Sequence, residues 1–349
     1  MTVNRHKGMC SPAAGRPGLL CLSVLALLSL GSCKDSAIFD YPGDCSVNYV
    51  VRFHYDYNMK WADAIAHEVE YVTLYLLDEG GNVAFEKTSE GEEFACAGYS
   101  MTLDVDPGQY SLLAWAGTKE NGSFTVSGTS FVEEMTCSLS TRDDGDGQYV
   151  DGDIDRLFYG WLPDQTFSSE PGTYVYDVSL IKDTNHVILA LMYTSGEDID
   201  CNDYIFKIQS ANGLMAWDNS LIGDETVTYY AWFTGQGNVE VSYSQAETRA
   251  DGNTALAEMT VGRLVDGVPA RLTVVSRETG STVFSYSLVE IAKLFKGYYN
   301  KDMDDQEFLD RQDEYDVIVF LDKGSDTWSY LTATVDVLAW KVVLQNTDL

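Results

Sequence analysis

The sequence predicts a mainly β protein made of two tandem β-sandwich domains, with one short helix in the second domain. Apolar residues alternate with polar ones at the period of half-buried strands, and Gly, Pro, Asn and Asp mark turns between these segments. Helical patterns do not alternate with the strands, which argues against an α/β fold. About 316 residues follow the N-terminal segment described below, a length typical of two domains.

The first domain, residues 46–167, is expected to be a series of strands. From Val47 to Tyr55 every second residue is apolar or aromatic, as in a strand with one buried face. Val69 to Leu77 is a nearly continuous apolar run that ends in a Gly-rich turn. A Pro-Gly turn at residues 106–108 then introduces a further strand.

The second domain, residues 168–349, is expected to begin after a loop-rich stretch. Residues 141–155 are dense in Asp and Gly, and loop-forming residues continue to Gly172. Strand patterns resume at Tyr174 and recur to the end of the chain. The exception begins at Ser287, which forms a capping box with Glu290 and is followed by apolar residues at helical spacing as far as Phe295. This helix should cover a sheet.

The N-terminus has the three parts of a lipoprotein signal peptide. A basic stretch precedes an apolar run of 12 residues, Leu19 to Leu30, and the segment Leu30-Gly31-Ser32-Cys33 follows. The run is too short to cross a bilayer, which needs about 20 residues. We therefore expect residues 1–32 to be removed, Cys33 to be acylated, and residues 33–45 to form a lipidated tether.

The charge of the chain excludes some partners. Removing the three basic residues of the signal peptide leaves 19 of the 22 Lys and Arg residues against all 54 Asp and Glu residues, a net charge near −35. No basic cluster follows Cys33, so a nucleic-acid partner is not expected. The same charge would repel an anionic membrane surface, so the lipid must provide the membrane attachment.

The sequence contains no recognisable cofactor or catalytic motif. His67-Glu68 begins like a zinc-protease helix, but Tyr71 stands where the second His would be needed. The other histidines are in separate segments, so we interpret them as surface or structural residues. Carboxylate pairs for glycoside hydrolysis meet in space rather than in sequence, and nothing here selects such a pair. We expect a non-catalytic protein without a cofactor.

Four cysteines remain beyond the acylated one: Cys45, Cys96, Cys137 and Cys201. They lack the spacing of zinc or redox sites. Export permits disulfides, and we expect one pair among the first three. The sequence does not select the pairing.

The acidic stretch at residues 141–155 has two interpretations. The first is a solvated loop that the fold does not need. The second is a weak calcium site, because its carboxylates could surround a hard cation. The candidate ligands are Asp144, Asp146, Asp151 and Asp153. Neither Asp144 nor Asp146 begins an EF-hand pattern, because Gly and Glu are absent from the required positions.

The C-terminal segment from Leu331 to Leu344 is expected to be one long strand, apolar on both faces toward its end. It could be the final strand of its own domain or a donor strand for a neighbouring molecule. The residues that would fill the neighbour's groove are Val335, Val337, Leu338, Trp340, Val342 and Leu344.

Several segments resemble the FimB-type minor fimbrial anchor lipoproteins, which belong to the fimbrillin superfamily of type V pili. The first is YDYNMKWADA at residues 55–64, followed by VTLY at residues 72–75. Further similar segments are DPGQY at residues 106–110, LFYG at 157–160, QEFLDRQDEY at 306–315 and WKV at 340–342. They span nearly the whole chain after the signal peptide.

The resemblance implies two transthyretin-like β-sandwich domains without enzymatic activity. It also implies a place at the base of a pilus on the outer membrane, with fimbrial shaft subunits as partners. In this superfamily, shaft subunits lose their N-terminus after an Arg that precedes the core. Here the first Arg after Cys33 is Arg52, inside the first expected strand, which favours a retained lipid and the anchor role over the shaft role. A tip subunit and an unrelated surface lipoprotein remain alternatives. Lys34-Asp35 resembles a short surface-export signal. The competing class is a surface glycan-binding lipoprotein of a nutrient-uptake complex.

Overall fold

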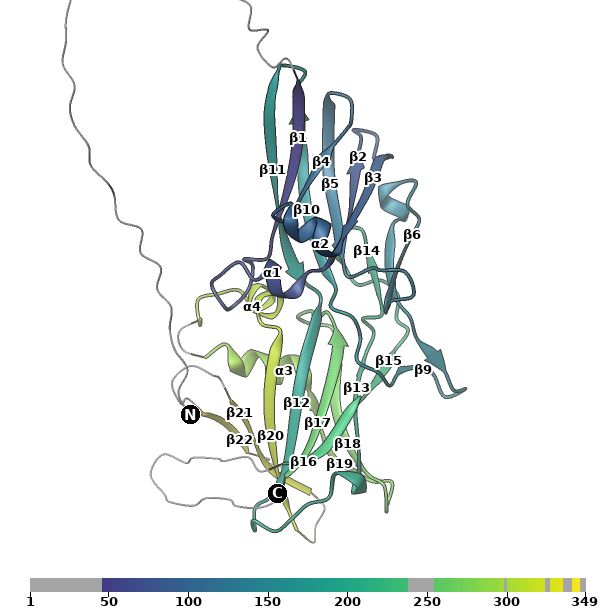
Figure 1. Cartoon of the computed structure of the whole chain (residues 1–349). Coiled ribbons are helices and arrows are strands. Elements are labelled where there is room, and N and C mark those ends of the chain that lie inside the picture. The colour runs from purple at the N-terminus through teal and green to yellow at the C-terminus, as the bar shows by residue number, and fades with distance from the viewer. Residues whose placement is uncertain (1–45, 238–253, 298–299, 324–326, 335–340, 346–349) are drawn as a thin grey trace, which may run out of the picture. The chain divides into compact units, whose positions relative to one another are not determined.

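The computed structural model describes residues 46–237, 254–297, 300–323, 327–334 and 341–345 (Figure 1). Within these residues the chain is mainly β, with several sheets and few helices, as the sequence predicts. Among the helices that the structure describes, none is long and apolar enough to cross a membrane. Cys33 and the expected tether lie outside the described residues.

The first sheet has seven strands. They are β1 (Val47–His54), β2 (Tyr71–Leu77), β3 (Val83–Glu90), β4 (Ser100–Leu103), β5 (Gly108–Ala116), β10 (Phe158–Phe167) and β11 (Gly172–Lys182). Their order across the sheet is β3-β2-β5-β10-β11-β1-β4. The expected alternation in β1 is confirmed, because Tyr49, Val51 and Phe53 are buried.

Strand β2 and the second half of β5, Leu112 to Ala116, are buried on both faces, and in β2 this explains the nearly continuous apolar run of residues 69–77. Leu74 and Leu76 of β2 contribute to a core on one face of the sheet. Tyr75 and Leu77 point the other way, into a larger core. Trp115 of β5 lies in that same larger core and is fully buried.

Two six-stranded sheets and one three-stranded sheet make up the rest. The second sheet contains β12 (Thr184–Tyr193), β16 (Phe233–Gly237), β17 (Thr254–Gly262), β20 (Glu314–Asp322), β21 (Thr327–Thr334) and β22 (Lys341–Gln345). The third contains β8 (Arg142–Asp143), β9 (Gln148–Val150), β13 (Tyr204–Ser210), β15 (Val227–Tyr230), β18 (Ala270–Ser276) and β19 (Thr282–Ser287). The small sheet contains β6 (Phe124–Ser127), β7 (Thr136–Leu139) and β14 (Leu214–Ala216). The larger core includes side chains from all of these sheets.

The predicted helix is α3 (Leu288–Phe295), and its N-cap is Ser287, whose hydroxyl accepts a hydrogen bond from the Glu290 amide. It packs on β18, β19 and β21 and buries Leu288, Ile291 and Phe295, as expected for a helix that covers a sheet. The other helical segments are α1 (Ile65–Glu68), α2 (Gly91–Cys96), α4 (Asp305–Arg311) and the 3₁₀ turns η1 (Val132–Glu134) and η2 (Cys201–Asp203).

Strand pairing continues across the boundary expected between residues 167 and 168. Strands β10 and β11 pair with each other, and both belong to the first sheet. The sequence places the strand at Tyr174–Leu180 in the second domain, but this strand, β11, belongs to the first sheet, because Val178 and Leu180 pack in the same core as Leu74 and Leu76. The chain passes to the second sheet at Asp183, between β11 and β12. Residues 45–349 form one compact unit, so the division into two domains stays a prediction.

The single strand expected from Leu331 to Leu344 is two antiparallel strands, β21 and β22. Leu331 pairs with Leu344, and Ala333 with Val342, within one sheet. The prediction of a single long strand was therefore wrong. An apolar pattern shows where extended chain occurs, but not where it reverses direction.

Candidate functional site

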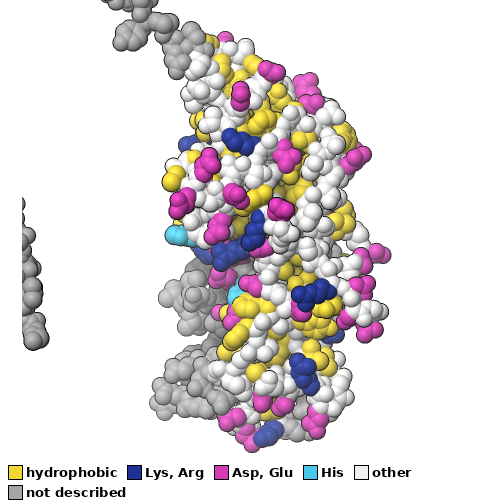
Figure 2. Space-filling view, turned by 45° about the vertical axis from the view of Figure 1, so that its right-hand side comes forward, with side chains coloured by type: hydrophobic (Ala, Val, Ile, Leu, Met, Phe, Trp, Pro, Cys, Tyr) yellow, Lys and Arg dark blue, Asp and Glu magenta, His cyan; other side chains and the backbone are white. Residues whose placement is uncertain are grey.

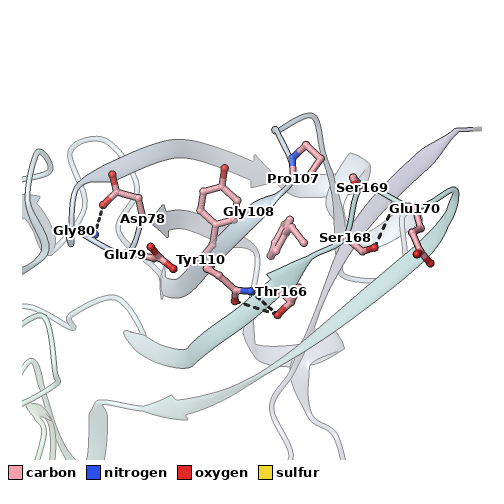
Figure 3. A pocket seen from close by; sticks show the side chains of 12 residues that line it. Asp78, Glu79, Gly80, Pro107, Gly108, Tyr110, Thr166, Ser168, Ser169 and Glu170 are labelled. Atoms are coloured by element: carbon pink, nitrogen blue, oxygen red, sulfur yellow. Dashed lines mark hydrogen bonds between the residues drawn. The ribbon is translucent and has the colours of Figure 1, made fainter.

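At the end where β1 begins, the first sheet has three loops, at residues 78–80, 104–107 and 168–171. We call this region the entry end, because the chain enters the described fold here (Figure 3). The Gly172 amide donates to the Ser46 carbonyl at 3.0 Å, and the Tyr49 hydroxyl donates to the Ser168 carbonyl at 2.7 Å. Both bonds attach the start of β1 to the same loop.

The entry end surrounds an open cavity of about 890 Å³. Aromatic rings of Tyr110 and Phe167 line it, with their centroids 5.1 Å apart. The Asp78 carboxylate accepts hydrogen bonds from the amides of Gly80 and Asn82. Hydrogen bonds from Asn82 hold the pKa of Asp78 below its usual value. Asp78 therefore stabilises its own turn, and Glu79 and Glu170 add further negative charge to the cavity lining.

Strand β1 is paired on both sides, in parallel with β11 and antiparallel with β4. Arg52 lies opposite Asp177 on one side and Ser100 on the other. Its guanidinium Nε lies 2.8 Å from the Asp177 carboxylate. A protease needs an extended and unpaired backbone, so the bond after Arg52 is protected while the sheet is intact.

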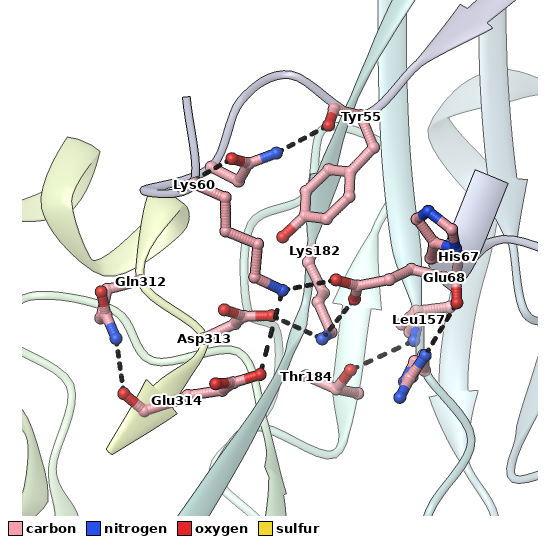
Figure 4. A network of polar contacts seen from close by, with 12 residues as sticks. Tyr55, Lys60, His67, Glu68, Leu157, Lys182, Thr184, Gln312, Asp313 and Glu314 are labelled. Carbon is pink, nitrogen blue, oxygen red and sulfur yellow. Dashed lines mark hydrogen bonds and ion pairs between the residues drawn. The ribbon is translucent and has the colours of Figure 1, made fainter. Parts of the chain in front are cut away.

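A buried ionic network surrounds the end of β11 (Figure 4). The Lys182 ammonium lies 2.8 Å from Glu68 and 2.6 Å from Asp313, and all three side chains are less than 10% exposed. Lys60 also donates to Glu68, at 2.6 Å. Burial raises the pKa of Glu68, but the hydrogen bonds from Lys182 and Lys60 outweigh it and lower the pKa overall. The Tyr55 hydroxyl, buried beside this network, has no hydrogen-bond partner in the described part of the chain.

A second buried cluster follows at the next residue, Asp183. Arg263 binds both carboxylate oxygens of Asp310, at 3.0 and 2.9 Å. The same guanidinium donates to the Asn219 carbonyl, and its Nε lies 3.6 Å from Asp183. The Asn219 side-chain Nδ2 donates to Asp183 Oδ1 at 3.0 Å, whereas Asp183 Oδ2 has no partner among the described residues. Two buried ionic clusters therefore hold the chain where it passes from the first sheet to the second.

Sequence reasoning missed these clusters because their members are far apart along the chain. Lys182 is 114 residues from Glu68 and 131 from Asp313. Only the pairing of β12 with β20 brings residue 313 beside residue 186. The sequence signal that could have indicated buried ion pairs is the presence of Lys182, Asp183 and Arg263 next to apolar strand patterns.

The four calcium candidates have different partners. Asp144 and Asp146 are exposed in the turn between β8 and β9, which form a short hairpin inside the expected loop. Asp151 accepts from Arg142 at 2.7 Å, and Asp153 accepts from a threonine hydroxyl of β17 at 2.6 Å. Within the described ranges, no three His, Cys, Asp or Glu side chains form a group that could hold a metal ion.

The cysteines and the histidine of the first sheet do not form a shared site in the described part of the chain. Cys96, Cys137 and Cys201 are free thiols, so no disulfide joins these three, and Cys45 lies outside the described residues. His54 lies between the carboxylates of Asp63 and Asp177, at 3.0 and 3.2 Å. These contacts belong to the surface of the first sheet.

The proposed donor residues are only partly described. Val335, Val337, Leu338 and Trp340 lie outside the described residues. Val342 and Leu344 are in β22, which pairs with β21 at the edge of the second sheet. This pairing corresponds to the alternative in which the last strand belongs to its own sheet.

Carboxylates are widely distributed over the surface. Figure 2 shows Asp and Glu side chains spread over the visible face, with Lys and Arg at fewer positions. This distribution follows from 54 acidic and 22 basic residues in the chain.

Comparison with known proteins identifies similar chains. The family model of fimbrillin-A associated anchor proteins Mfa1 and Mfa2 matches residues 41–346. No curated protein matches the sequence.

Solved structures with a similar fold come from Bacteroides and Porphyromonas species. A proposed polysaccharide-binding protein from Bacteroides thetaiotaomicron is 26% identical with a TM-score of 0.73, and the match covers 87% of this chain and 100% of the other. A proposed adhesin from the same species is 27% identical with a TM-score of 0.72, covering 85% and 98%. The fimbrial anchor protein Mfa2 from Porphyromonas gingivalis is 17% identical with a TM-score of 0.62, covering 85% and 99%, and shows the same fold.

Proposed function

Because the chain belongs to the family of fimbrillin-A associated anchor proteins Mfa1 and Mfa2, we propose that it anchors a fimbria at the cell surface without catalysing a reaction. In this proposal a lipid on Cys33 holds it in the outer membrane, facing outward, and it binds fimbrial shaft subunits. The FimB-type assignment within the fimbrial anchors is part of the same proposal.

The observation that carries the proposal is the position of β1. This strand is the direct continuation of the expected tether, and it pairs with strands on both of its sides. Removing it would expose the buried neighbours of Tyr49, Val51 and Phe53. An intact β1 keeps the fold connected to Cys33, which is what a lipid anchor requires. Two or more acyl chains provide stable membrane attachment.

The lipid is tested by Cys33→Ala. We expect the variant to leave the membrane fraction, or to accumulate as unprocessed precursor, and to lose a metabolic fatty-acid label completely. Cys96→Ala is the matched control, because Cys96 is an exposed free thiol; it should keep both the label and the membrane location. Equal labelling of the Cys33 variant and the unmodified protein would contradict the proposal.

Contact with the shaft is proposed to use the C-terminal strand, with main-chain hydrogen bonds and side-chain pockets as in other strand additions. Strand β22 lies at a sheet edge and pairs only with β21 among the described strands. It could therefore separate without breaking a central strand pair. Donation requires β22 to leave β21 and enter a groove of the next subunit.

Deleting residues 342–349 tests this mode of contact. We expect the shortened protein to stay anchored and folded but to lose co-purification with shaft subunits. Deleting only residues 346–349, which follow β22, should leave co-purification unchanged. A large drop in melting temperature and rapid proteolysis of the longer deletion would show instead that β22 is an internal strand.

Glycan binding at the surface is the second candidate function. The observation in its favour is the similarity to the proposed polysaccharide-binding protein described above, at 26% identity over all of that chain. Retention of the purified protein in polysaccharide gels would separate this function from anchoring alone.

A further inference from the structure

The face of the second sheet that points away from the larger core carries a group of polar side chains at the start of β12. His186 lies opposite Thr260 of β17 and opposite Glu314 of β20. Residues directly opposite one another in neighbouring strands project from the same face. Glu258 precedes Thr260 by two residues and therefore shares this face. Three strands thus place polar groups side by side.

Trp232 and the segment before β10 enclose this group. The Trp232 amide donates to the Glu258 carbonyl at 3.0 Å, which places the tryptophan beside β17. The resulting cavity has a volume of about 240 Å³. We call it the Trp232 cavity. Its lining includes Asp153, Arg156, His186, Trp232, Glu258 and Thr260.

The indole ring is held by contacts on two sides. Its Nε1 donates to the Thr260 hydroxyl at 3.2 Å, and that hydroxyl donates to Asp153 at 2.6 Å. The ring stacks on His186, with centroids 6.1 Å apart and an angle of 26° between the planes. His186 Nε2 in turn lies 3.3 Å from Glu258. The aromatic surface is therefore positioned before any ligand arrives, which lowers the entropy lost on binding.

Hydrogen-bonding capacity remains in the cavity. Among the described residues, the Arg156 guanidinium forms one hydrogen bond, to the His67 carbonyl at 3.5 Å, which leaves most of its five donors for a ligand. Within the described part of the chain, the contacts of the Asp153 and Glu258 carboxylates use one of the two oxygens of each, so the second oxygen can accept a hydrogen bond from a ligand. Donors and acceptors thus lie around an aromatic ring.

This combination fits a ligand with many hydroxyl groups. A hydroxyl both donates and accepts, so it can bind Arg156 and a carboxylate together. An anionic ligand would meet Asp153, Glu258 and Glu314 in the same cavity, in a chain of net charge −32. Arg156 and Lys182, which also line the cavity, disfavour a free cation. Phe233, beside Trp232 and 45% exposed, extends the aromatic surface outside the cavity.

We propose that the Trp232 cavity binds a neutral sugar unit of a polysaccharide, with the sugar ring against Trp232 and its hydroxyls on Arg156, Asp153 and Glu258. This role is independent of anchoring. It rests on the second candidate function, glycan binding, and assigns that function to this cavity. A neighbouring sugar unit would contact Phe233.

The test is retention of the purified mature protein in native gels containing a neutral polysaccharide: mannan, glucan, galactan or xylan. We expect at least one of these to retard the protein. Trp232→Ala and Arg156→Gln should each weaken that binding about tenfold or more, because each removes a stacking surface or charged hydrogen bonds. Trp61→Ala is the matched control, since Trp61 is 71% exposed and lies outside the cavity.

Melting curves establish that the variants are folded. Arg156 is exposed, so Arg156→Gln remains a valid test if Trp232→Ala unfolds the protein. The proposal is overturned if none of the four polysaccharides binds, if only uronate polymers bind, or if the cavity variants bind as well as Trp61→Ala. Membrane fractionation of Arg156→Gln should match the unmodified protein, so a failure of sugar binding is distinguishable from a failure of anchoring.

Discussion

Replacing Lys182 by methionine is expected to lower the free energy of unfolding by about 3–5 kcal/mol. The Lys182 ammonium lies between the buried carboxylates of Glu68 and Asp313, at 2.8 and 2.6 Å. Methionine keeps the apolar stem but removes the charge, so two buried carboxylates lose their shared partner. Urea unfolding monitored by tryptophan fluorescence measures the change.

Lys323→Met is the matched control for this experiment. Lys323 lies 2.6 Å from Glu197, but both side chains are 51% exposed. Exposed pairs contribute about 0–1 kcal/mol, so this variant should unfold at nearly the same urea concentration as the unmodified protein. Equal losses in the two variants would mean that burial of the Lys182 network does not stabilise the fold.

Asp183→Asn is expected to stabilise the protein at pH 8 and to leave its stability unchanged at pH 4. Burial raises the pKa of Asp183 to about 7, and the opposing effects of Arg263 and Asn219 do not offset it. An aspartate in the unfolded chain titrates near 3.9. Between these two values the native protein holds a proton that the unfolded chain lacks, so stability falls as the pH rises through this window.

Asparagine resembles the protonated acid but does not ionise, so the variant does not lose stability as the pH rises through this window. The gain at pH 8 should be on the order of 2–4 kcal/mol, measured by urea unfolding at a series of pH values. Asp177→Asn is the control with the opposite sign, because the Arg52 hydrogen bond lowers the pKa of Asp177. An unchanged pH dependence in Asp183→Asn would show that Asp183 is ionised in the native protein throughout.

Local patterns predicted much of the fold. Alternation between Val47 and Tyr55 predicted β1, and the Ser287–Glu290 capping box predicted α3 with its correct first residue. These features depend on residues within one strand or one helical turn of each other, so the sequence contains all the necessary information. The segments at residues 55–64 and 306–315 indicated the fimbrial anchor family, which the match over residues 41–346 establishes.

Pairing between distant segments could be decided only by the tertiary structure. It assigned β11 to the first sheet, divided the C-terminal segment into β21 and β22, and brought Lys182 between Glu68 and Asp313. It also placed Trp232 beside His186 and Glu258, which no spacing along the chain indicates. Period and turn chemistry specify that a strand forms and which side chains share a face. The neighbour of each strand depends on how all the apolar faces are buried together, which is a property of the whole fold.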